Sequence, residues 1–72
     1  MMTFDQVFAH GYEKDFYIKF IVETYGEGYR HGNMQDTKMV KTHAKTIEAL
    51  HGIDHRDVMK EVADHSRSID MK

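Results

Sequence analysis

The stretch YEKDFYIKFIVETY, residues 12–25, is the most apolar and aromatic part of the chain, and it decides how the rest packs. Its polar residues Asp15, Lys19 and Glu23 are spaced four apart, so on a helix they form one narrow polar stripe. Apolar side chains cover most of the remaining circumference. A helix that is apolar on nearly every side is buried by its own domain or by a partner.

The same stretch also has a strand-like alternation between residues 16 and 24. Three observations favour a helix. On a strand Ile21 would face outward, and no second clear strand follows in the sequence to pair with it. The polar stripe gains favourable charge pairing only on a helix. We therefore predict a helix over residues 12–25.

The residues before this stretch allow two interpretations of where the helix begins. Thr3 and Gln6 have the spacing of a capping box, so a helix starts near residue 4. Gly11 either ends a short first helix at His10 or lies inside one helix over residues 4–25. A seven-residue register favours the continuous or kinked helix; its members are Phe4, Val7, Gly11, Ile18, Ile21 and Tyr25.

Two amphipathic helices follow in the second half of the chain. Asp36 is a suitable N-cap for the first helix, Gly52 ends it, and Asp54 is the N-cap of the second. The pattern predicts helices at about 37–51 and 55–68, which form a hairpin packed on helix 12–25. His43 falls in the centre of the apolar face of its helix, where we expect a hydrogen-bonded core histidine. The other residues expected on buried faces are Met39, Val40, Ala44, Ile47, Leu50, Val58, Met59, Val62, Ala63 and Ile69.

Composition favours a small all-α domain. The chain has 72 residues, with no proline and no cysteine. A chain of this length buries only about 60% of its unfolded surface, so small scaffolds gain stability from disulfides, metals or association. The lack of cysteine excludes disulfides and thiolate zinc sites. We predict a single all-α domain over 1–72, a small bundle of three to four helices with a long aromatic-rich N-terminal helix.

The charge balance bears on location and on partners. A net charge of −2 is too small for strong non-specific attraction to nucleic acid or to anionic membranes. No apolar run exceeds three residues, and no basic segment followed by an apolar one stands at the N-terminus. No membrane span and no signal peptide is therefore expected, and we predict a cytoplasmic protein.

Few residues suggest chemistry. The sequence has no cysteine nucleophile, no glycine-rich phosphate loop and no serine in a nucleophile elbow, so we do not expect an enzyme. His51 and His55 have the spacing of two zinc ligands on one helix, but Gly52 and Asp54 interrupt that helix. We predict no metal site and no cofactor.

The turn at residues 52–54 resembles that of a helix-turn-helix DNA-binding motif. A glycine, an apolar residue and an N-cap precede Val58 and Val62, at plus six and plus ten from the glycine. The resemblance implies an alternative function, a DNA-binding regulator whose 55–67 helix presents Arg56, Lys60 and Arg67 to the groove.

Two features depart from that motif. Glu48 stands where the motif has a small residue, and His51 stands where it has an apolar one. Acidic residues at 57, 61 and 64 lie beside the basic side chains, where they repel phosphates.

The remaining class is a protein-interaction module. Four Tyr, four Phe and six Met supply large and adaptable contact surfaces. Helix 12–25 has more apolar surface than two neighbouring helices cover, which leaves one side for a partner. We predict a non-catalytic regulatory or inhibitory module, forming a homodimer and resembling accessory or phage-type effector proteins in size and charge. The predicted contact residues are Phe16, Tyr17, Phe20, Ile21, Tyr25, Tyr29, Arg30 and His31.

Overall fold

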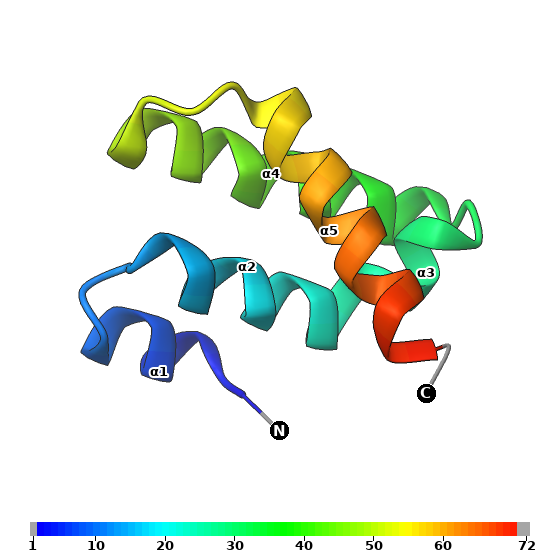
Figure 1. Ribbon diagram of the computed structural model, residues 1–72, viewed down its shortest axis with the longest axis horizontal. Coiled ribbons are helices and arrows are strands. Elements are labelled where there is room, and N and C mark those ends of the chain that lie inside the picture. Colours follow the sequence, from blue (N-terminus) through cyan, green and yellow to red (C-terminus); the bar gives the residue numbers. More distant parts are fainter. Residues whose placement is uncertain (1, 71–72) are drawn as a thin grey trace.

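The computed structural model describes residues 2–70, which form helices joined by short turns (Figure 1). The elements are α1 (Phe4–Ala9), α2 (Lys14–Ile21), the π-helical turn η1 (Val22–Gly26), α3 (Glu27–Arg30), α4 (Met34–His51) and α5 (His55–Asp70). No strand occurs among the described residues. The prediction of an all-α fold is confirmed, and with it the helical interpretation of the aromatic stretch.

The helix α1 is a separate short helix with His10 as its C-cap, so the interpretation in which Gly11 ends a first helix is confirmed and the favoured continuous helix is wrong. Its expected capping box is present. At its end Gly11 has a φ of +68°. The N–H of Gly11 donates to the carbonyl of Phe8 and the N–H of Tyr12 donates to the carbonyl of Val7, both at 3.0 Å. This Schellman arrangement satisfies the last carbonyls of α1 and needs a left-handed residue, which glycine supplies without strain.

The elements α2, η1 and α3 form one continuous helix from residue 14 to residue 30, called helix 14–30 below. The backbone stays right-handed helical across both junctions. Gly26 and Gly28, which follow the predicted helix 12–25 in the sequence, lie inside it. Helix 14–30 ends at Gly32, where φ is +81° and the N–H of Asn33 donates to the carbonyl of Gly28 at 2.8 Å. Residues 31–33 therefore form a short turn between this helix and α4.

The helices α4 and α5 form the predicted hairpin. The N-cap of α4 is Asn33 and not Asp36, because Asn33 Oδ1 accepts a hydrogen bond from the N–H of Asp36 at 2.9 Å. Gly52 ends α4 with a φ of +71°, and Asp54 caps α5 by accepting from the N–H of Arg56 at 2.8 Å. In Figure 1, α4 runs back along α2 and α5 crosses over η1, so the hairpin covers one side of helix 14–30.

An apolar core joins helix 14–30 to the hairpin. Leu50 and Ile69, which were expected in this core, are 52% and 54% exposed because they lie in the last turns of α4 and α5. The buried apolar residues are Val7, Tyr17, Ile18, Phe20, Ile21, Val22, Val40, Ala44, Ile47, Val58 and Val62.

None of the helices in the described part is long and apolar enough to cross a membrane.

The helix α5 packs closely on helix 14–30 at Gly26. A Cβ atom at this glycine would lie 3.2 Å from both the Cβ and the Oγ of Ser66. Ser66 is buried, and its Oγ accepts a hydrogen bond from Arg30 Nε at 3.3 Å. Gly26 thus serves close packing of two helices, which explains why it lies in a helix interior.

Candidate functional site

Four aromatic rings surround the side chain of His43 on α4. Their centroids lie 5.6 to 5.9 Å from the centroid of the imidazole. Tyr25 stacks on His43, whereas Tyr17 and Phe20 meet it edge-on. Because the rings come from α1, α2 and η1, this His43 cluster fixes three segments to α4. Its members are Phe4, Tyr17, Phe20, Tyr25 and His43.

One short hydrogen bond lies inside this cluster. The Tyr17 hydroxyl and His43 Nδ1 are 2.6 Å apart. Burial lowers the pKa of His43 below its usual value, because the imidazolium loses hydration, and burial raises the pKa of the Tyr17 phenol. Both shifts favour the neutral forms, so the bond joins two uncharged groups at neutral pH. The expected hydrogen bond of His43 is present, but the residue is half-buried at the edge of the core and not inside it.

An exposed aromatic surface lies on α1 and on the turn that follows it. Phe8 is 66% exposed and Phe4 is 40% exposed. Both rings meet the ring of Tyr12 edge-on, at centroid distances of 5.7 Å and 6.0 Å. Large exposed apolar groups that gather in one place mark contact sites on soluble proteins. We call Phe4, Phe8 and Tyr12 the exposed aromatic face.

Three of the predicted contact residues lie in the core. Tyr17 and Ile21 are fully buried and Phe20 is 6% exposed. In the folded single chain these side chains are covered, so they offer no open surface to a partner. The physical reason is the break at Gly11, because it folds α1 back along α2 (Figure 1) and covers the side that a continuous helix would leave open.

The other predicted contact residues do not form one surface. Phe16 is half-buried at the start of helix 14–30, and the ring of His10 stacks on it at 4.0 Å. Tyr29 and Arg30 are half-buried at the opposite end of this helix, and His31 is exposed in the turn that follows. Tyr25 is half-buried in the His43 cluster.

The three residues of the DNA-binding alternative lie exposed on α5. Arg56 donates to Asp54 through Nη2 at 2.9 Å and through Nε at 3.2 Å. Arg67 Nη1 lies 3.7 Å from a carboxylate oxygen of Asp64. Two of the three cations are thus paired with neighbouring carboxylates, which weakens their attraction for phosphate. Lys60 is exposed as well, and the acidic residues Asp57, Glu61 and Asp64 lie within four positions of it on the same helix.

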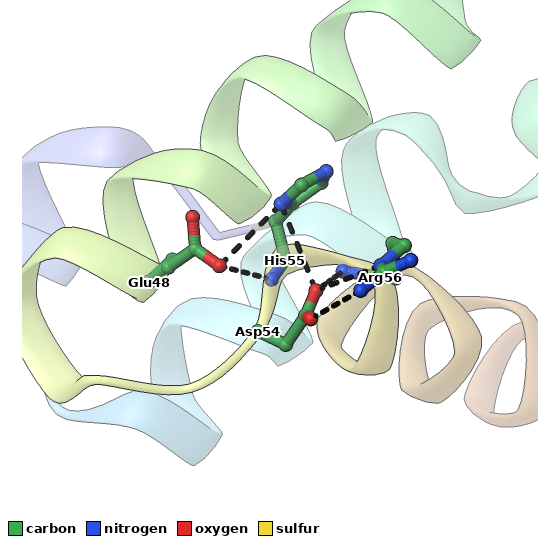
Figure 2. A network of polar contacts seen from close by, with 4 residues as sticks. All are labelled: Glu48, Asp54, His55 and Arg56. Atoms are coloured by element: carbon green, nitrogen blue, oxygen red, sulfur yellow. Dashed lines mark hydrogen bonds and ion pairs between the residues drawn. The ribbon is translucent and has the colours of Figure 1, made fainter.

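Figure 2 shows a second polar group, at the turn between α4 and α5. Glu48 Oε2 accepts from the N–H of His55 at 3.0 Å and lies 3.5 Å from His55 Nδ1. Asp54 Oδ1 lies 3.7 Å from the same ring nitrogen. One ligand atom from each of the three residues falls within 4.8 Å of the others, a spacing compatible with a metal ion.

The contacts of this group are those of a helix cap. Hydrogen bonds from the side chain and the backbone of Arg56 lower the pKa of Asp54 to about 2. Glu48 satisfies the first N–H of α5 from across the turn, and Asp54 satisfies the next. Capping of α5 therefore explains the position of both carboxylates. The sequence predicted the role of Asp54, but gave no sign that Glu48 reaches across the turn.

Comparison of the chain with protein-family models, with curated proteins and with solved structures gave no match. The function is therefore inferred from the geometry of the described residues.

Proposed function

We propose that this chain is a small regulatory or inhibitory interaction module that acts in the cytoplasm, without catalysis, by binding another protein through its exposed aromatic face. One observation carries the proposal: Phe8 leaves 66% of its surface in solvent, and Phe4, one helical turn away, leaves 40%. Aromatic side chains that anchor in a pocket of a partner supply a large part of the binding energy in protein interfaces.

The rings of this face are held in fixed positions. Phe4 meets the rings of Tyr17 and Phe20 edge-on, at centroid distances of 5.9 Å and 5.7 Å. Phe8 is held against Tyr12. Side chains that are already ordered lose less conformational freedom when a partner binds. The partner that fits this arrangement has an apolar groove that receives two aromatic rings from successive turns of a short helix.

The charge of α1 points to the same kind of partner. Its sequence FDQVFA contains one charged residue, Asp5. A contact made mainly by phenylalanine rings should respond little to salt. Binding to nucleic acid through Arg56 and Lys60 should instead weaken steeply as salt rises.

The test compares Phe8→Ser with a matched control, Met34→Ser. Met34 is 87% exposed at the start of α4, at the opposite end of the molecule from α1 (Figure 1). Each variant loses one exposed apolar side chain, and neither changes the core. Wild type and both variants are immobilised and used to capture proteins from a lysate with and without nuclease treatment, each at low and high salt. Circular dichroism confirms that all three are folded.

We expect wild type and Met34→Ser to capture the same protein. Capture of this protein by Phe8→Ser should fall at least about tenfold, because the variant loses an aromatic anchor. Equal capture by all three chains would refute the role of the exposed aromatic face. Capture that disappears after nuclease treatment or at high salt would favour the DNA-binding alternative.

A further inference from the structure

The connection between α1 and α2 contains two successive residues in the left-handed region. Gly11 has a φ of +68° and Tyr12 a φ of +55°. Tyr12 is the one non-glycine residue of the described chain with a positive φ. A bulky side chain is strained in this region, and the Schellman motif needs a left-handed conformation only at the glycine. The strain at Tyr12 therefore accompanies the reversal that places α1 on α2. We call Gly11 and Tyr12 the hinge.

Few contacts attach α1 to the rest of the chain. Val7 is the one buried side chain among its six residues. Phe4 packs on Tyr17 and Phe20, and next to the hinge His51 Nε2 donates to the carbonyl of Tyr12 at 2.8 Å. A helix of this length is not stable alone in water. It therefore stays helical only when it is packed against a larger surface or continues into another helix.

The sequence is compatible with α1 and α2 joined as one straight helix. Residues 10–13 contain no proline, and the seven-residue register that includes Phe4, Val7 and Ile18 continues across the hinge. In a straight helix Tyr12 would adopt an ordinary right-handed conformation, which relieves its strain. Phe4 and Val7 would then leave their sites on the same chain, and those sites would be open.

We propose that a second copy of this chain fills those sites, so that two copies exchange α1 and form a symmetric dimer. Phe4 of each copy would pack on the Tyr17, Phe20 and His43 of the other. The contacts would be those of the single chain, made between chains, which is how exchanged dimers form at low energetic cost. Only the hinge and the concentration then decide between monomer and dimer. This inference does not depend on whether the exposed aromatic face binds another protein.

The main test is Gly11→Ala. A Cβ at residue 11 would meet nothing within 4 Å, so the substitution causes no clash. The φ of +68° at this residue strains any L side chain in the bent hinge. Alanine also stabilises a helix interior relative to glycine, which favours the straight hinge. Both effects favour the straight hinge by at least about tenfold per chain. Two hinges open in a dimer, so the dimer association constant should rise about 100-fold. Sedimentation equilibrium over a range of concentrations measures this constant.

An isotope-filtered NMR experiment identifies the exchange itself. Labelled and unlabelled Gly11→Ala chains are mixed in denaturant and refolded together. The rings of Phe4 and His43, whose centroids are 5.7 Å apart in the single chain, should then show an NOE between a labelled and an unlabelled copy. A dimer without this NOE would overturn the proposal, as would a Gly11→Ala variant that stays monomeric at the concentrations used for NMR.

The matched control is Gly32→Ala. Gly32 has a φ of +81° and equally open surroundings, but it lies between α3 and α4. This variant should be less stable without stronger association. Association that rises as much as in Gly11→Ala would mean that general destabilisation drives the dimer, which contradicts the proposal.

A second variant replaces Gly11→Ala if that chain does not fold. The exposed Glu13 caps α2 by accepting from the N–H groups of Asp15 and Phe16 at 3.0 Å and 3.1 Å. A straight helix needs no cap there, so Glu13→Ala weakens only the bent hinge. The dimer association constant should rise about 25-fold, from about fivefold per hinge. An unchanged constant in Glu13→Ala would refute the exchange.

Discussion

The hydrogen bond between Tyr17 and His43 should be a sensitive point of the fold. Tyr17 is fully buried, and its hydroxyl lies 2.6 Å from His43 Nδ1. Tyr17→Phe removes one oxygen atom and keeps the ring that packs on Phe4 and Phe20. It leaves Nδ1 of the half-buried His43 without this partner, and a polar group left unpaired away from water costs about 1–3 kcal/mol.

For a domain of this size, a loss of about 2 kcal/mol lowers the midpoint of thermal unfolding by about 8–16 °C. Circular dichroism during heating, and urea denaturation at neutral pH, measure the change. A double-mutant cycle with His43→Phe tests whether the lost hydrogen bond to His43 causes this change in stability. If the loss arises from the unpaired imidazole, Tyr17→Phe should be less destabilising by about 1–2 kcal/mol in the His43→Phe background. Additive effects, or a Tyr17→Phe variant as stable as wild type, would refute the reasoning.

Two further predictions concern the core. Burial lowers the pKa of His43 below 6.5, so between the two pKa values the unfolded chain binds a proton that the folded chain does not. The free energy of unfolding should therefore fall as pH drops through 6.5. It should level off below the folded-state pKa. Urea denaturation from about pH 7.5 to about pH 5 measures this, and a His43→Phe variant with the same pH dependence as wild type would contradict it. Ile47→Ala should lower the free energy of unfolding by about 2–5 kcal/mol, since Ile47 is fully buried. Ile69→Ala should change it by less than about 0.5 kcal/mol, since Ile69 is 54% exposed, and equal losses in urea denaturation would contradict the assigned burial.

The hairpin could be predicted because its signals are local. Gly52 ends α4 in the left-handed conformation, and Asp54 caps α5 two residues later. Both depend on side chains and backbone groups within a few positions, and the apolar periodicity on either side is regular. Tertiary packing did not have to decide between alternatives here.

The two ends of the aromatic helix were predicted less well, because glycine has more than one use. Gly11 fits both a helix interior and a helix stop, and the apolar Tyr12 that follows it was the available sign of a Schellman motif. Gly26 and Gly28 fit a stop by propensity, yet both lie in helix 14–30. At Gly26 the close approach of Ser66 on α5 overrides propensity.

The burial of several predicted contact residues could not be read from the sequence for a related reason. A sequence shows that a helix is apolar on most sides, but it does not show how many elements cover those sides. The reversal at Gly11 supplies a third covering element, α1, whose Phe4 ring packs on Tyr17 and Phe20, and both of these residues are buried within one chain. The exposed aromatic surface is therefore on α1, at Phe4 and Phe8, and not on the helix that α1 covers.

The His43 cluster and the hinge should respond independently to perturbation, because they differ in what changes on exchange. Phe4 contacts Tyr17, Phe20 and His43 both in the single chain and in the proposed dimer, so protonation of His43 weakens both forms to the same extent per chain. Low pH should therefore reduce the free energy of unfolding without shifting the balance between monomer and dimer. Gly11→Ala acts only on the bent hinge, and should shift that balance at every pH. A dimer that dissociates at low pH while the chains stay folded would mean that the two copies meet through contacts other than an exchanged α1.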